Sequence, residues 1–172
     1  MASLDPQSRI SYHLMYMISA VMITISFFLS TVQELITGIR RIAFASDILI
    51  TDYMAIAGVG SAFFNAGCVT LITLLLMQIC KVPMHGGGIS TVGLMAGFSF
   101  FGKNIVNMWF MLFGTWLYAR IRKEPLSRYL TFSLMSTSLG PLISSLLFAN
   151  GFSPKSFLLA LLVGALIGFV AP

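Results

Sequence analysis

The chain has 172 residues, of which 58% are hydrophobic and only 9% are charged, and its mean hydropathy is +0.94. A soluble domain has about 25% charged residues, so this composition excludes an ordinary soluble globule. The net charge is +5, but the basic residues lie in short segments between apolar stretches, as in membrane-protein loops. They do not alternate with aromatic residues as in a nucleic-acid groove. We therefore expect one polytopic membrane domain over residues 1–172, all-α and multi-pass in the inner (plasma) membrane, with the lipid bilayer and no nucleic acid as partner.

Charged residues separate the apolar stretches that we expect to cross a bilayer, whose hydrocarbon core is about 30 Å thick. The second stretch, about residues 53–80, contains several small residues that let a neighbouring helix approach closely, namely Gly58, Gly60, Ser61 and Gly67. Before it, the segment "ITGIRRIAFASDILI" carries a basic pair between apolar residues and is expected to lie flat in the membrane interface. The predicted spans are about residues 12–32, 53–80, 105–119, 129–149 and 156–172.

Glycine and proline patterns mark two features near the end of the chain. Gly140-Pro141 predicts a kink in the fourth span. Gly164 and Gly168 form a GxxxG motif, typical of a helix packed closely against another. The last span has no polar tail, so we expect a fragment or half of a larger assembly; a genuine short C-terminus is the alternative.

The apolar stretch from Ile89 to Ile121 fits neither one crossing nor two. As one helix it would be about 50 Å long, whereas two spans and a turn need about 40 residues or more. A re-entrant half-helix at about residues 89–101, followed by one crossing, fits the length. Gly102-Lys103-Asn104 then marks the break. We expect Ser90 or Thr91 to cap the half-helix and Asn104 to cap the next helix.

The break is the candidate functional site. Interrupted helices are tolerated in membranes where the backbone is buried in protein or lines a wet cavity, and they mark solute sites in transporters. A lysine deep in a bilayer costs about 2.5–3.5 kcal/mol on insertion scales. The alternative is that Lys103 extends to the interface or balances the carbonyl groups that end the half-helix. The predicted solute pathway comprises Lys103, Asn104, Asn107 and Gly102, with Asn65, Ser90 and Thr91 nearby.

Enzyme and metal chemistry find no support in the sequence. His85 precedes three glycines, as in the oxyanion motif of esterases, but the G-x-S-x-G nucleophile elbow is missing. His13 and His85 are far apart, and no carboxylate stands at a metal-ligand spacing from either. We therefore expect no enzyme, no metal and no cofactor.

The basic residues do not choose between two topologies. With a re-entrant half-helix, one face carries Arg40, Arg41 and the 120–128 cluster, and the N-terminus is outside. If residues 89–101 cross fully, Arg9, Lys81 and the 120–128 cluster share a face, and the N-terminus is inside. The length argument favours five transmembrane helices plus one re-entrant half-helix. Five is odd, so a second copy would be inserted upside down, making this chain half of an inverted repeat.

Several short motifs resemble one family. They are Gly97-Phe98, Phe101-Gly102-Lys103-Asn104, Asn107, Gly114 with "WLYARIRKEP", and Leu139-Gly140-Pro141. Over about residues 50–172 the chain resembles an uncharacterised bacterial polytopic membrane-protein family, domain of unknown function 1576, whose members look like two related halves. The resemblance implies an N-terminal half and implies no activity. The span order also resembles, at fold level only, one repeat of the urea-transporter fold.

We expect a membrane channel or transporter, or half of one, for a small polar or anionic solute. Its partner would be a second half or a further copy of the chain. The alternative is a non-transporting scaffold or assembly subunit that packs its partners through Gly93-xxx-Gly97 and Gly164-xxx-Gly168.

Overall fold

The computed structural model describes residues 5–46 and 51–172, and its regular elements there are all helices. This confirms the prediction of an all-α chain. In the described part, three stretches are long and apolar enough to cross a membrane, namely Pro6–Leu29, Val59–Ile79 and Leu130–Phe148, and α9 is apolar but shorter. The elements are α1 (Pro6–Leu29), α2 (Val32–Ala43), α3 (Tyr53–Ala57), α4 (Val59–Ile79), α5 (Gly86–Phe98), α6 (Trp109–Arg122), η1 (Leu126–Arg128), α7 (Leu130–Ser136), η2 (Thr137–Leu139), α8 (Gly140–Phe148) and α9 (Pro154–Val170).

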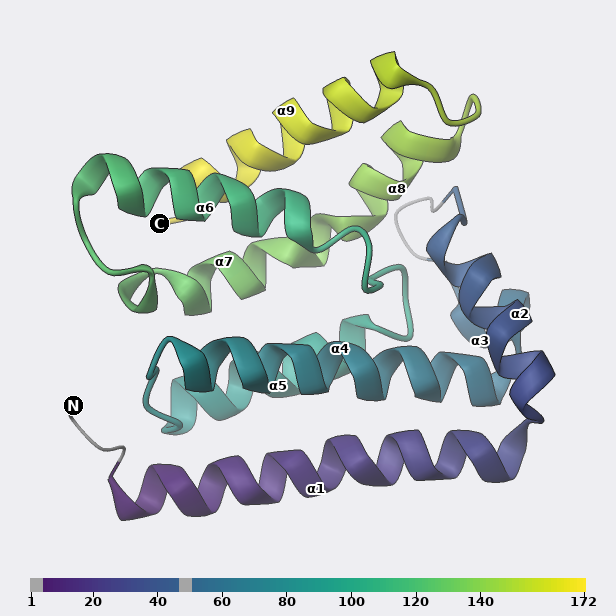
Figure 1. Ribbon diagram of the computed structural model, residues 1–172, viewed down its shortest axis with the longest axis horizontal. Helices are drawn as coiled ribbons and strands as arrows, with labels where there is room; N and C mark the ends of the chain where they lie inside the picture. Colours follow the sequence, from purple (N-terminus) through teal and green to yellow (C-terminus); the bar gives the residue numbers. More distant parts are fainter. Residues whose placement is uncertain (1–4, 47–50) are drawn as a thin grey trace.

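The first two helices begin at side-chain caps that the sequence supplies locally. Asp5 accepts a hydrogen bond from the backbone N–H of Ser8 (2.9 Å) at the start of α1. Thr31 and Glu34 form a capping box that ends the first span and opens α2. α2 lies across the end of α1 and α4 (Figure 1) and buries Leu35 and Ile42. Residues 36–43 of the predicted amphipathic segment lie in α2, and its residues 47–50 lie outside the described residues. That this segment lies in a membrane interface stays a prediction.

Close helix packing depends on glycines at two contacts. Between α1 and α4, a Cβ atom on Gly67 would lie 2.6 Å from the Ile23 side chain. Between α6 and α9, a Cβ atom on Gly114 would lie 1.9 Å from the Ala165 carbonyl oxygen, and one on Gly168 would lie 1.8 Å from that of Met111. The close approach predicted from Gly67 and from Gly164-xxx-Gly168 is confirmed.

The helices of the described chain run in two ways. α1, α4, the α7–α8 pair and α9 run lengthwise, whereas α5 and α6 form a hairpin that starts and ends at one end of the bundle (Figure 1). The start of α1 and the end of α9 also lie at that end. Residues 99–108 are outside both helices, so α6 has only 14 residues, about 21 Å. Five crossings plus one re-entrant half-helix stay a prediction.

Several predicted boundaries also change. The span predicted at 53–80 is split at Gly58, which has a φ of +85° and separates α3 from α4. The half-helix is α5, and it begins at Gly86 with no side-chain cap. Ser90 and Thr91 instead bond back to the carbonyl oxygens of Gly86 and Gly87 (2.9 Å each), so neither is the cap. The predicted kink is confirmed: η2 interrupts the helix between α7 and α8, just before Gly140.

Candidate functional site

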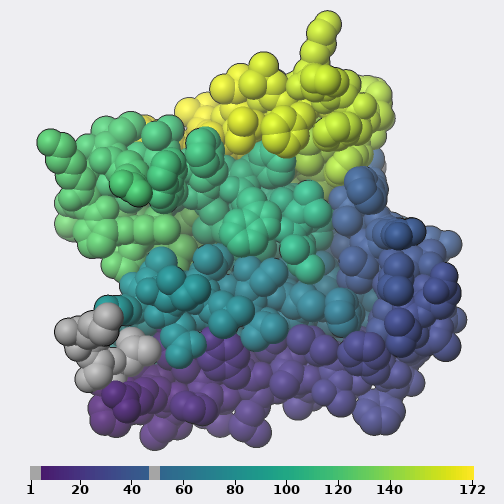
Figure 2. All heavy atoms as spheres, viewed as in Figure 1, coloured from purple at the N-terminus to yellow at the C-terminus, as the bar shows by residue number. Residues whose placement is uncertain are grey.

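The loop between α5 and α6, residues 99–108, lies at the middle of the molecule, and six of its ten residues are buried, whereas Phe101 and Val106 are exposed. Figure 2 shows the teal atoms of this part of the chain lying between those of α1 (purple) and the green and yellow atoms of the later helices. The backbone N–H groups of Phe101 and Lys103 both donate to the carbonyl oxygen of Phe98, at 2.9 and 3.2 Å, which ends α5 in a tight turn. Gly102 has a φ of +97°, a conformation that other residues rarely adopt. The break is therefore real and longer than the three residues predicted.

Two asparagines fasten this loop to other parts of the chain. The side-chain amide of Asn65, on α4, donates to the carbonyl oxygens of Ser99 (2.8 Å) and Lys103 (2.9 Å). The Asn104 amide donates to the Ile42 carbonyl oxygen (3.1 Å) and the Tyr53 hydroxyl (3.0 Å). The Asn65 bonds satisfy carbonyl groups that the broken helix leaves unpaired. The Asn104 bonds join the loop to α2 and to the Tyr53 side chain at the start of α3.

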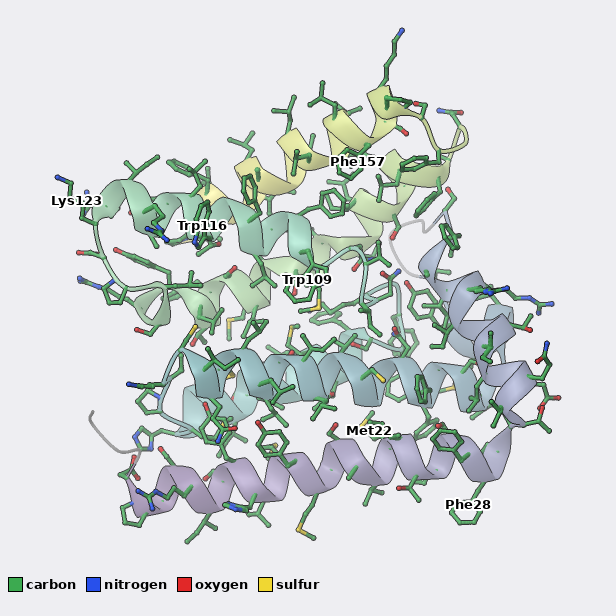
Figure 3. The ribbon with its side chains drawn as sticks, in the orientation of Figure 1. Met22, Phe28, Trp109, Trp116, Lys123 and Phe157 are labelled. Atoms are coloured by element: carbon green, nitrogen blue, oxygen red, sulfur yellow. The ribbon has the colours of Figure 1, made fainter. Side chains whose placement is uncertain are left out.

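Asn104 and Asn107 also form reciprocal hydrogen bonds between side chain and backbone. The Asn104 side-chain oxygen accepts from the backbone N–H groups of Val106 (2.9 Å) and Asn107 (3.0 Å). The Asn107 side-chain oxygen accepts from the backbone N–H of Asn104 (3.1 Å). Asn104 therefore caps a turn at residues 105–108. Our prediction that it caps the next helix is wrong, because α6 starts only at Trp109 (Figure 3).

The loop faces the second interruption, between α7 and α8. The Asn107 amide donates to the carbonyl oxygen of Gly102 (2.8 Å) and to the Ser144 hydroxyl (2.9 Å). Gly102 packs on Pro141, and a Cβ atom there would lie 2.5 Å from the proline ring. A Cβ atom on Gly140 would lie 2.6 Å from the Asn107 side-chain oxygen. Two broken helices thus meet at one place.

Lys103 has an unusual environment at this meeting point. Only 1% of its surface is exposed. Its ammonium nitrogen lies 2.9 Å from the Met95 sulfur and 5.5 Å from the centre of the Phe98 ring. Among the residues that the structure describes, no carboxylate pairs with it. The buried position excludes the alternative in which Lys103 extends to the interface.

Further polar side chains continue from Lys103 along the contact between α5 and α7. The Thr137 hydroxyl lies 3.4 Å from the same Met95 sulfur. One turn earlier on α7, the hydroxyl oxygen of Ser133 is buried, and it has no hydrogen-bond partner within the described chain. One turn before Met95 on α5, Thr91 is also buried. A buried polar group without a partner is rare and calls for an explanation.

The structure therefore brings most of the predicted site together. Lys103, Asn104, Asn107 and Gly102 adjoin Asn65, while Thr91 lies toward the start of α5 on its buried face. Ser90 is exposed on the other face of α5 and does not join them. The sequence reasoning missed Tyr53, Met95, Ser99, Ser133, Thr137 and Ser144. For Met95 and Ser99 the sequence did offer a signal, because they precede Lys103 at intervals of four residues, the spacing of one helix face. No sequence signal indicated the other four residues.

Metal ligands are not grouped in the described part of the chain, where no three His, Cys, Asp or Glu side chains could hold one ion. The carbonyl oxygens of Ser99, Gly102 and Lys103 in the loop already accept hydrogen bonds from asparagine amides. The distinctive feature of the site is one buried lysine whose amine lies beside a thioether and an aromatic ring.

Comparison with known proteins gives a family but no relative of known activity. No curated protein and no solved structure matches the chain. The bacterial origin of the family and the likeness to a urea-transporter repeat stay expectations. A family described as "Protein of unknown function (DUF1576)" matches residues 31–172, which include every helix from α2 to α9 and the whole of the buried loop. The chain therefore belongs to this family of unknown function.

Proposed function

We propose that the chain is a membrane channel or transporter, or half of one, for a small polar or anionic solute that passes Lys103. The apolar surface supports the proposal that the chain is a multi-pass protein of the inner (plasma) membrane. Phe28 is 85% exposed, Val170 71% and Leu166 63%; lipid contact removes the cost of exposing such side chains to water. The same lengthwise helices contain the three stretches of membrane-spanning length.

The charge distribution supports one orientation of this bundle. Arg9, Lys81 and the 120–128 cluster belong to helix ends that share one end of the bundle, whereas Arg40, Arg41 and Lys155 belong to the other (Figure 1). The positive-inside rule then puts the start of α1 and the end of α9 in the cytoplasm. In this arrangement α5 and α6 are two short helices that enter from the cytoplasmic side. The even number of lengthwise passes does not favour an inverted repeat.

The observation that carries the proposal is the environment of Lys103. An ammonium group surrounded by a thioether and an aromatic ring has lost its hydration without gaining a carboxylate, which is costly in a medium of low dielectric constant. Residues of this kind inside membrane proteins commonly serve solute or ion pathways. A bound anion would supply the missing counter-charge, and the unpaired Ser133 hydroxyl would supply a hydrogen bond.

The pathway that we propose follows the contact between α5 and α7. Thr91, Met95 and Lys103 line one side of it, and Ser133 and Thr137 line the other. These side chains are almost entirely buried, so the conformation described is a closed one. Conduction would require α7 to move relative to α5, and the interruption at η2 is a suitable hinge.

The test is solute flux into proteoliposomes, measured by light scattering after mixing with formate, nitrate or urea. We expect at least one solute to enter faster than in empty liposomes and Lys103→Met to abolish the difference. Lys155→Met is the matched control, because Lys155 is an exposed lysine on α9. Circular dichroism and gel filtration would check folding. Equal flux in wild type and Lys103→Met, or no flux of any solute above empty liposomes, would overturn the proposal.

A scaffold or assembly subunit is the second candidate, and one observation favours it. Cβ atoms added to Gly93 and Gly97 would meet nothing within 4 Å, so this GxxxG face of α5 is open to another helix. Gly164 and Gly168 are already used against α6. Cysteine labelling separates the two candidates. In a variant lacking Cys68 and Cys80, Ser133→Cys should react with a water-soluble thiol reagent if the pathway opens, whereas Leu134→Cys should not.

A further inference from the structure

We propose that the end of α6 and the turn after it bind the phosphate headgroup of an anionic phospholipid. A cavity of about 580 Å³ lies there, between the last turn of α6 and the residues that lead into η1. Its lining includes Trp116, Arg120, Lys123, Glu124 and Leu126. This inference rests on the membrane location and does not depend on transport.

The charges of the cavity are unbalanced. The Arg120 guanidinium stacks over the Trp116 ring, 5.2 Å from its centre, which holds it in place by a cation–π contact. Glu124 is the one acid lining the cavity, and it is engaged elsewhere. One of its oxygens lies 2.8 Å from the Arg128 guanidinium, and the other accepts from the Tyr129 hydroxyl. Within the described residues, Arg120 and Lys123 have no carboxylate partner.

The two cations are not needed to complete the helix end. Lys123 adopts the left-handed conformation with a φ of +56°. The backbone N–H of Lys123 donates to the Arg120 carbonyl oxygen (3.2 Å), and that of Glu124 donates to the Ala119 carbonyl oxygen (3.0 Å). The backbone itself therefore satisfies these carbonyl groups of α6. The side chains of Arg120 and Lys123 are left for a ligand.

The surface beside the cavity explains why the ligand is a lipid. In Figure 3, Lys123 lies at the outer end of α6 and Trp116 lies farther along the helix. Phe113, Trp116 and Leu117 are 44%, 40% and 38% exposed, and the rings of Phe113 and Trp116 stack at 5.8 Å. An acyl chain of the lipid can lie along this apolar strip while the phosphate of the lipid headgroup reaches Arg120 and Lys123. Basic pockets at cytoplasmic helix ends bind anionic headgroups in this way.

The test uses the full chain purified in detergent, with added phosphatidylglycerol or phosphatidylcholine of identical acyl chains. Phosphatidylglycerol at saturating concentration should raise the thermal unfolding midpoint by about 5 °C or more above phosphatidylcholine. The variant Arg120→Gln/Lys123→Asn should lose most of this difference; asparagine tolerates the left-handed conformation. Arg40→Gln/Arg41→Gln, at the other end of the bundle, is the matched control and should keep it. Native mass spectrometry should show about tenfold weaker lipid binding in the first variant alone.

Three results would overturn the assignment. They are equal midpoints with the two lipids, equal losses in the two double variants, and the same shift with inorganic phosphate alone, which would indicate a free-anion site. If the double variant does not fold, Lys123→Asn decides the question, because this side chain is exposed. An unchanged lipid effect in that single variant would count against the proposal. Failure of solute flux with an intact lipid effect would refute transport alone.

Discussion

The close contact between α6 and α9 provides the sharpest test of the fold. Replacing Gly168 by alanine would put a Cβ atom 1.8 Å from the carbonyl oxygen of Met111 and 2.6 Å from its carbonyl carbon. These are backbone atoms of α6, so no side-chain rotation can relieve the contact. An ordinary contact needs about 3.4 Å or more, so α6 and α9 would have to separate by more than 1 Å, which would also open the close contact between Gly114 and Ala165.

The expected cost follows from two opposing effects. Overpacking of a tight contact costs about 1–3 kcal/mol, occasionally more, whereas alanine gains up to about 1 kcal/mol over glycine in a helix. We expect a net loss of about 1–2 kcal/mol. For a chain of this length that lowers the thermal midpoint by roughly 2–8 °C.

The assay is thermal unfolding of the purified chain in detergent, followed by circular dichroism. Gly93→Ala is the matched control, since a Cβ atom there meets nothing within 4 Å and should leave the midpoint unchanged or raise it. Truncating the Met111 side chain should not rescue Gly168→Ala, because the obstacle is backbone. If Gly168→Ala is as stable as Gly93→Ala, the α6–α9 contact described is incorrect.

Three further predictions concern the buried loop and the first helix. Asn104→Ala should destabilise the fold by about 3 kcal/mol or more in denaturant titration, because it leaves several buried groups without partners; an effect equal to that of exposed Asn150→Ala would contradict this. Gly102→Ala should cost about 1–3 kcal/mol from its positive φ and its contact with Pro141, and Gly102→Ala/Pro141→Ala should recover part of it in the same titration. At the start of α1, the Ser8 N–H lowers the pKa of Asp5 below its ordinary 3.8. The stabilisation of α1 by the Asp5 cap is therefore complete above pH 3.8, the ordinary pKa. It is lost as the pH falls through the lowered pKa of Asp5 in the folded protein. Hydrogen-exchange protection of the first turn of α1 should fall accordingly at acid pH, and the same fall in Asp5→Asn would exclude this cause.

The sequence alone determined the features that depend on local composition. Apolar length sets the helices, since a chain with 9% charged residues must satisfy its backbone internally in lipid. The break was located at Gly102-Lys103-Asn104 because glycine and polar residues interrupt an apolar helix there. Gly164-xxx-Gly168 identified a close packing surface, although not the helix that occupies it. Asn65, Asn104, Asn107 and Lys103, which belong to the buried cluster, were named for the same local reasons.

Only the tertiary structure decided the partners of those residues and the path of the chain. Asn104 bonds Ile42 from 62 residues away, and Asn65 reaches Ser99 across 34; no local pattern indicates such pairs. Ser90 and Thr91 are neighbours in sequence, yet one is exposed and the other buried. Their helix is apolar on all sides, so its sequence does not distinguish a lipid-facing side from a protein-facing one. Both the orientation of α5 and the short α6 that follows it were set by packing against α4, α7 and α9.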